Sequence, residues 1–475
     1  MNFVYPSNFL IAALNLCLLG LCLMACSCAQ TPYQTKPLNP AQTSAQLSNK
    51  DATSADFNAY LIKQGYKEAD LPFAEWDLND LTLCALYYHS KLDVAKAQLA
   101  LANTAVNSAG TQQSPTLGGR LAHSNQANND KSPWTIGLDV EIPVETTNKR
   151  QIKVEEAQHL LAAARLYVAE VAWQLRSQIA NDLLRYYENS VLQKQLTNAL
   201  NQQNNLIKLL TKRMQLGAAS NTELNAAKLL QQKAQFSLNA EQKKSAEILA
   251  VLAADVGLTN EKFALLHLKP LDIEAALSTV PDMEHLQQKA LLNRVDIRRS
   301  LSKYAAAESK IKLEIAKQTP DISLNPGFAF EFGDSIWSLG FSSLFSLLNK
   351  NQTLVAEATK LREIEGAQFE ALQAEVIAAV SQAQAGYQAS LQNVLQAKQQ
   401  LANQRQYSQK LQNQFDAGLI DRLALTQNNM NTQALEQQLV TAQFQQLNAM
   451  LALENSVQMP LNADNILNDK TIQIQ

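Results

Sequence analysis

The chain has 475 residues, more than one ordinary compact core holds, so several domains or one elongated architecture are expected. Its formal net charge of −3 argues against a nucleic-acid-binding protein, which would carry a basic excess. Gly and Pro are scarce, at 14 and 13 residues, and this favours long helices because both residue types weaken helix interiors.

The first segment predicts export. An apolar run from Phe9 to Ala25 is short for a bilayer-spanning helix but has the length of the apolar part of a signal peptide. The run ends in L-M-A-C, which resembles the bacterial lipobox, where cleavage before the cysteine is followed by its acylation. We interpret Cys26 as the lipidation site, and the alternative is cleavage after Ala29. The following stretch, Thr31–Asp56, is rich in Pro, Thr, Gln and Ser and predicts an extended tether.

Two halves of the chain follow one plan. Landmarks recur in the same order at an offset of about 200 residues, and such self-similarity indicates a structural repeat. Each half predicts a helix, a pair of strands, a very long helix, a break at a glycine and a returning helix. The paired landmarks are Asp93 and Asp296, Trp134 and Trp337, and Gly217 and Gly418.

The long helices are predicted from the absence of breakers. No Pro occurs from Val144 to Lys269 or from Gly327 to Met459, and Arg150–Leu216 also lacks Gly. An unbroken helix of that last length would run about 100 Å. Apolar residues at spacings of three and four predict a coiled-coil-like seam, which Gln404 and Ser408 interrupt in the second half. In the first half this seam contains Val168, Ala172, Leu175, Ile179, Leu183 and Tyr186.

Between the helices the apolar residues alternate with polar ones, which predicts strands with one apolar face. Three strands follow from the alternation, at Trp134–Val144, Ile322–Phe332 and Trp337–Leu347, and the repeat places a fourth within Thr116–Ser124. One apolar face with aromatic ends is typical of transmembrane β-barrel strands. The alternative is a half-buried sheet in a soluble domain. The residues expected to form an aromatic girdle are Trp134, Phe328, Phe332 and Trp337.

A membrane sheet of this size would require several copies of the chain. Four strands cannot close a barrel, because the smallest usual barrel has about eight strands. An open edge in hydrocarbon would leave backbone groups without hydrogen bonds, at several kcal/mol each. A ring of identical chains with cyclic symmetry is therefore expected.

Several stretches of the second half, together with the duplicated layout, resemble the TolC-like outer-membrane efflux family, the exit ducts of tripartite export systems. They are R-V-D-I before A-A-A-E-S-K-I, then Q-T-P-D-I-S-L, W-S-L-G-F-S-S-L-F-S-L-L and F-D-A-G-L-I-D-R-L, and the resemblance covers residues 81–461. It implies an α+β membrane protein, a homotrimer whose twelve-stranded barrel, four strands per chain, continues into a long α-helical coiled-coil periplasmic tunnel. It also implies a periplasmic adaptor protein and an inner-membrane pump as partners, and outer-membrane lipid around the barrel.

The sequence departs from the family pattern at two places. The family's Arg-Pro-Asp is Arg294-Val295-Asp296 here, which loses a helix-starting Pro but leaves Asp296 as an expected N-cap. Relatives often carry acidic residues shortly after the second glycine break, where this chain has only Asp421.

The glycine breaks are predicted to be helical hairpin tips. Gly217 and Gly418 can take the left-handed conformation that reverses the chain, with Ser220 or Asn221 and then Asp421 as N-caps of the returning helices. In the trimer that the resemblance implies, six tips would meet at the periplasmic end. A ring of acidic side chains there would form a cation-favouring constriction, and an arginine could pair with one of them. The candidate constriction residues are Glu223, Asp421 and Arg422.

No spacing of His, Cys and carboxylates indicates a metal or catalytic site, and no phosphate-binding loop is present. We therefore expect a non-enzymatic protein without cofactor, metal or nucleic-acid partner. The function expected is a passive outer-membrane exit duct, lipid-anchored and with a periplasmic helical domain, and the alternative is a soluble periplasmic coiled-coil scaffold or adaptor. The expected segments are 1–25 signal peptide, 26–56 lipidated N-terminus and tether, 57–112 first-repeat helix and equatorial elements, 113–147 first β-hairpin of the barrel, 148–257 first long helical hairpin, 258–282 inter-repeat linker and equatorial element, 283–318 second-repeat helix, 319–348 second β-hairpin of the barrel, 349–459 second long helical hairpin and 460–475 C-terminal tail.

Overall fold

The computed structural model describes residues 33–125, 131–278, 283–331, 333–343 and 351–461, and the chain divides into two units after Asn49. The signal peptide and Cys26 lie outside the described residues. In the first unit, α2 (Pro40–Ser48) occupies part of the expected tether, so the prediction of an extended chain is wrong there. The helix begins because Asn39 Oδ1 accepts the Ala41 amide and Pro40 presets the first helical residue.

The second unit contains a cluster of short elements packed on the long helices. It consists of α3 (Ala55–Lys63), η1 (Glu68–Asp70), α4 (Leu78–Tyr88), α8 (Asn260–Phe263) and α9 (Ile273–Ser278). Phe57, Trp76 and Phe263 are buried in one core with Leu175 and Ile179 of the long helix α6 (Lys149–Gln215). This cluster joins the chain before the first repeat to the linker between the repeats, where Trp76 also forms a parallel bridge with Leu268.

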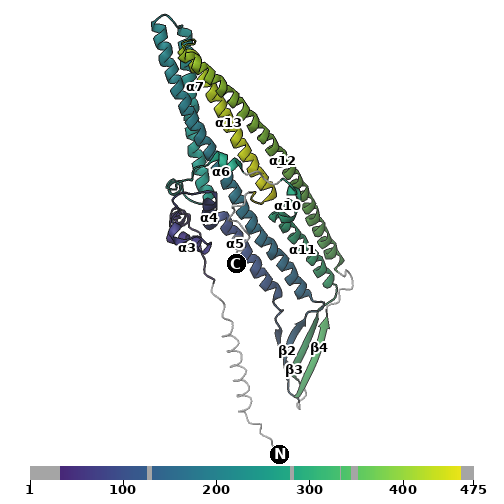
Figure 1. Cartoon of the computed structure of the whole chain (residues 1–475). Coiled ribbons are helices and arrows are strands. Elements are labelled where there is room, and N and C mark those ends of the chain that lie inside the picture. The colour runs from purple at the N-terminus through teal and green to yellow at the C-terminus, as the bar shows by residue number, and fades with distance from the viewer. Residues whose placement is uncertain (1–32, 126–130, 279–282, 332, 344–350, 462–475) are drawn as a thin grey trace, which may run out of the picture. The chain divides into compact units, whose positions relative to one another are not determined.

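The long helices form a layer in which α6 is central (Figure 1). Beside the sheet the order of packing is α5, α6, α11, α12, and toward the tips it is α7, α6, α13, α12. One edge of the layer is therefore α5 and α7, and the other is α12. In the described part of the chain, no helix has the length and apolarity to cross a bilayer. The helices of the two repeats are α5 (Ser90–Gly110), α7 (Asn221–Val256), α10 (Leu286–Asn293), α11 (Val295–Ala316), α12 (Gln352–Asp416) and α13 (Arg422–Val457).

All four expected strands are present and form one antiparallel sheet in the order β1-β2-β3-β4 (Figure 1). The strand that only the repeat indicated lies within the expected range. The sheet continues from one end of the long helices, and both hairpin tips lie at their other end (Figure 1). The strands are β1 (Thr116–His123), β2 (Trp134–Val144), β3 (Ile322–Glu331) and β4 (Asp334–Ser343).

The polar residues in the second seam form a satisfied network across α12 and α13. Gln404 Nε2 donates to Asn428 Oδ1 at 2.8 Å, and Asn428 Nδ2 donates to Ser408 Oγ at 2.8 Å. The Ser408 hydroxyl also lies 2.8 Å from that of Thr432. Because a buried polar group is costly only when it lacks a partner, these residues fix the register of the hairpin rather than weaken it.

The expectation that Asp296 caps α11 is wrong. Arg294 is the N-cap residue, and Asp296 lies in the first turn, where its carboxylate holds the Arg294 guanidinium with Nε–Oδ1 at 3.0 Å. The physical reason lies in the neighbouring helix end: Val295 is not a proline, so its amide needs an acceptor, and Gln458 Oε1 supplies one at 2.9 Å. Arg294 Nη1 in turn donates to the Ser456 carbonyl at 2.6 Å.

Gly418 and Gly386 allow a matched test of the turn. Gly418 has φ +71° and open space where a Cβ would stand, so Gly418→Ala should cost about 1–2 kcal/mol by left-handed strain alone. Gly386 lies inside α12 and also has open space around it, so Gly386→Ala should gain about 0.5–1 kcal/mol. Midpoints of thermal unfolding in detergent should move in opposite directions, and a shift of the same sign in both variants would contradict the turn assignment.

Candidate channel wall and hairpin tips

The sheet has one apolar face that is exposed to the surroundings. The register places alternate residues of the four strands on this face, and Phe328 of β3 stands opposite both Leu138 and Trp337. Trp337, Leu339 and Phe341 are 81%, 76% and 81% exposed, so none of the described residues covers them. Exposed apolar residues on this face are Leu117, Leu121, Trp134, Ile136, Leu138, Ile142, Val144, Ile322, Leu324, Trp337, Leu339 and Phe341.

The opposite face of the sheet is polar and lined with small residues. Arg120, Asp139 and Glu141 point to this side, as their alternation with the apolar residues requires. The Asp139 carboxylate lies over Gly118, where an added Cβ would come within 2.6 Å of its oxygen atoms. Glycine at this position therefore leaves room for a charged side chain against the sheet.

The two outer strands of the sheet each pair on one side only among the described residues. β1 follows α5 and β4 leads into α12. The open edges of the sheet are therefore continuous with the two edges of the helical layer, so one partner surface would extend along both.

The predicted girdle residues lie toward the end of the sheet that is away from the helices. Phe328 and Trp337 are cross-strand neighbours with ring centroids 4.9 Å apart, and the ring centroids of Trp134 and His123 are 4.6 Å apart. Phe332 lies outside the described residues. Their assignment as a girdle stays a prediction.

Both hairpin tips reverse at the expected glycines. Gly217 and Gly418 have φ +73° and +71°, and the residue after each donates its amide back to the helix: Ala218 to the Arg213 carbonyl at 2.7 Å, and Leu419 to the Gln414 carbonyl at 2.8 Å. This is the Schellman arrangement, which satisfies carbonyl groups at the helix end.

The returning helices begin with side-chain caps. Ser220 rather than Asn221 caps α7, and Glu223 completes a capping box by accepting the Ser220 amide at 2.8 Å. Asp421 caps α13 by accepting the Ala424 amide at 2.8 Å. Two of the three candidate constriction residues therefore also hold their own helix starts.

The tip carboxylates keep their charge to low pH. The backbone amide of Ala424, and then the Arg213 guanidinium, hold the pKa of Asp421 below its usual value. The backbone and hydroxyl of Ser220 do the same for the pKa of Glu223. A group with a depressed folded-state pKa loses its charge only as pH falls through that lowered value, so both side chains are anionic at neutral and mildly acidic pH.

The cation that contacts Asp421 is Arg213, which belongs to the first hairpin of the same chain. Arg422, the expected candidate, is the exposed first residue of α13. Sequence reasoning missed Arg213 because it treated each tip separately. The signal was its place in the last turn of α6, four residues before Gly217, at the tip that the repeat makes equivalent to that of Asp421.

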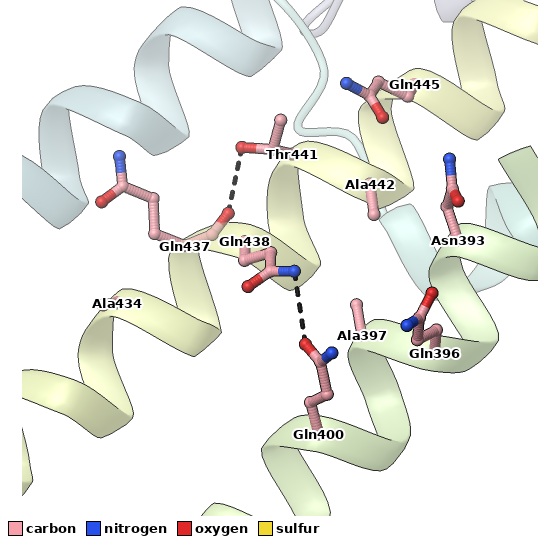
Figure 2. Close-up of a pocket in the computed structure, with 10 residues that line it drawn as sticks. All are labelled: Asn393, Gln396, Ala397, Gln400, Ala434, Gln437, Gln438, Thr441, Ala442 and Gln445. Carbon is pink, nitrogen blue, oxygen red and sulfur yellow. Dashed lines mark hydrogen bonds between the residues drawn. The ribbon is translucent and has the colours of Figure 1, made fainter.

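A polar groove of about 490 Å³ lies between α12 and α13 (Figure 2). Gln438 Nε2 donates to Gln400 Oε1 across it at 3.3 Å. Its walls carry amides and no charged group, so it offers hydrogen-bond donors and acceptors without charge. The lining residues are Asn393, Gln396, Ala397, Gln400, Ala434, Gln437, Gln438, Thr441, Ala442 and Gln445.

The chain has the fold of the TolC-like outer-membrane channels, in which each chain supplies helices and a four-stranded sheet. It is similar to the outer-membrane protein VceC of Vibrio cholerae, at 20% identity and TM-score 0.66, over 81% of this chain and 97% of that one. It is also similar to the CmeC channel of Campylobacter jejuni, at 12% identity and TM-score 0.64, over 92% and 95%. The MtrE channel of Neisseria gonorrhoeae, in its open state, matches at 14% identity and TM-score 0.65, over 82% and 90%. No family model and no curated protein sequence matches the chain.

Asp421→Asn separates the charge of the tip from its capping role. Asn is as good an N-cap as Asp, so α13 should still begin at Arg422 while the carboxylate is lost. If Asp421 lines the constriction, cation preference in planar bilayers should fall, and blocking by divalent cations should weaken. Ser220→Ala is a suitable control, because it weakens a cap at the other tip without changing charge. Ion preference equal to that of the unchanged protein would remove Asp421 from the constriction.

Proposed function

We propose that the chain is the outer-membrane exit duct of a tripartite efflux or secretion system, a passive channel built from three identical chains. The observation that carries the proposal is the sheet, with an apolar face open to its surroundings and two unpaired edge strands among the described residues. In water such a face would promote aggregation, whereas in hydrocarbon it is the stable outer surface of a barrel.

The two edges of the helical layer support the ring. Leu229 and Phe236 on α7 are 66% and 76% exposed, and Leu395 on α12 is 53% exposed. These apolar residues lie on the two helices that form the edges of the layer toward the tips. Contact between the α7 edge of one chain and the α12 edge of the next buries both, and it repeats around a closed ring.

Two chains would give eight strands and three would give twelve, and both numbers allow a barrel. The choice of three rests on the likeness to the TolC-like fold and on the resemblance of the sequence to that family. The polar sheet face then lines the pore, and the paired tips stand at its periplasmic end. We further propose lipidation at Cys26 and docking of a periplasmic adaptor, with an inner-membrane pump supplying the energy.

The membrane assignment is tested by arginine on each face of β4. Leu339→Arg puts a cation on the apolar face and should destabilise the inserted barrel by about 2–4 kcal/mol. Ser338→Arg, one residue earlier, faces the polar side opposite Gly327 and should insert normally. Membrane fractionation of both variants measures the difference. Recovery of the unchanged protein in the soluble periplasm would favour the alternative, a coiled-coil scaffold.

The ring is tested by a disulfide between edges. Phe236 lies fifteen residues from the start of α7 (236 − 221), and the exposed Ala402 lies fourteen from the end of α12 (416 − 402), so the two stand at similar distances from the tips. They occupy opposite edges of one chain, and Phe236→Cys with Ala402→Cys should therefore link only neighbouring chains. Oxidation should give dimer and trimer bands on denaturing gels, and each single variant should give no trimer. A ladder beyond three chains, or none, would overturn the three-chain ring.

A further inference from the structure

A pair of carboxyl groups is buried where α7 ends against α6. Asp255, the last residue but one of α7, is 6% exposed, and Asp182 of α6 is 7% exposed. Gln178, which lies one turn before Asp182 on the same face of α6, donates to Asp255, so the carboxyl group of Asp255 lies beside that of Asp182. Two adjacent buried carboxylates repel each other, and one proton held between them would remove that repulsion.

The side chains around the carboxyl pair neutralise its negative charge only in part. Gln178 Nε2 donates to Asp255 Oδ1 at 2.5 Å, and Arg185 Nη1 donates to Asp182 Oδ1 at 2.6 Å. The second oxygen of Asp255 is buried and accepts no hydrogen bond from the described residues. Lys91 at the start of α5 attracts the Asp255 charge, and the backbone of His89, between α4 and α5, packs against Gly257 at the end of α7. No cation makes a hydrogen bond to Asp255 among the described residues.

The position on the helix adds to this imbalance. The C-terminal end of a helix carries a partial negative charge, which disfavours an anion there. In the second repeat, Ser456 stands 201 residues after Asp255 and Gln384 stands 202 after Asp182, so the carboxyl pair belongs to the first hairpin alone. The second repeat forms its helical hairpin without such a pair, so the fold of the repeat does not require it.

We propose that Asp182 and Asp255 share one proton and act as a pH-sensitive fastener between α6 and α7, closed at acidic pH and loosened when the proton leaves. The apolar part of the same joint is formed by Ile248, Leu252 and Val256 of α7 with Ile179 of α6. Since α7 is an edge helix of the layer, loosening at its C-terminal end acts on the surface offered to a neighbouring chain. The fastener does not depend on the exit-duct function.

The sign of the effect follows from the protonation states. Burial, and then the hydrogen bond and charge of Asp182, raise the pKa of Asp255 to about 7, far above its value in an unfolded chain. The folded joint therefore binds more protons than the open one between about pH 4 and pH 7, so its stability falls as pH rises through this window.

Hydrogen exchange on the full chain in detergent measures the joint directly. With a folded-state pKa near 7, the opening equilibrium of the C-terminal turns of α7 should rise about tenfold from pH 6 to pH 8, after correction for intrinsic exchange. Asp255→Asn has nearly the same shape, can still accept from Gln178 and cannot titrate, so its protection at pH 8 should equal that at pH 6. Asp182→Asn removes the repulsion but not the burial, so it should move the transition to lower pH.

Asp80→Asn is the matched control. Burial also raises the pKa of Asp80 to about 7, but this residue lies in the first turn of α4. Its substitution should leave the pH dependence at the end of α7 unchanged. Protection of α7 that is equal at pH 6 and pH 8 in the unchanged protein, or that keeps its pH dependence in Asp255→Asn, would overturn the fastener.

Discussion

Among the described residues the two edges of the four-stranded sheet are unpaired, and this constrains the rest of the structure. β1 and β4 present rows of backbone N–H and C=O groups beside an apolar face, and in hydrocarbon those groups have no water to bind. Only pairing of β1 with β4 of another copy satisfies them while keeping the apolar face outward. Because β1 is joined to α5 and β4 to α12, the same pairing brings the edges of two helical layers together. In the proposed ring, the sheet and the helical layer therefore close by one operation.

The two repeats give each chain an internal symmetry, but equivalent positions in the two repeats carry different residues and make different contacts. At the start of α6, Lys149 Nζ donates to Asp321 Oδ1 at 2.8 Å and to the Thr319 carbonyl at 2.6 Å. At the start of α12, Asn351 Nδ2 instead donates to Glu314 Oε2 at 2.9 Å. Both contacts tie the start of a long helix to the end of α11 or to the turn that follows it. A contact at this position occurs in both repeats, whereas the residues that make it differ between them.

Local patterns predicted the elements of this fold because the relevant forces are local. Absence of Pro, period-two alternation and two left-handed glycines define the helices, strands and turns without reference to distant residues. Prediction was wrong or silent where a distant residue decides. Gln458 takes the capping duty expected of Asp296, Arg213 supplies the partner of Asp421, and the raised pKa of Asp255 comes from burial against α6. No spacing in one segment encodes such contacts.

The interactions at the hairpin tips differ in size, so those that hold the two hairpins together can be distinguished from those that set the charge at the tip. The contact between Arg213 and Asp421 is exposed, and exposed ion pairs contribute at most about 1 kcal/mol. Beside it, Leu206, Leu210 and Leu224 of the first hairpin are buried with Leu423 of the second packed against them. Each fully buried leucine contributes about 1.5–3 kcal/mol, so this apolar cluster holds the two hairpins of one chain together. If the tips form the proposed constriction, its opening would have to repack that cluster, while the carboxylates, already fixed as helix caps, would set the charge that a passing ion meets.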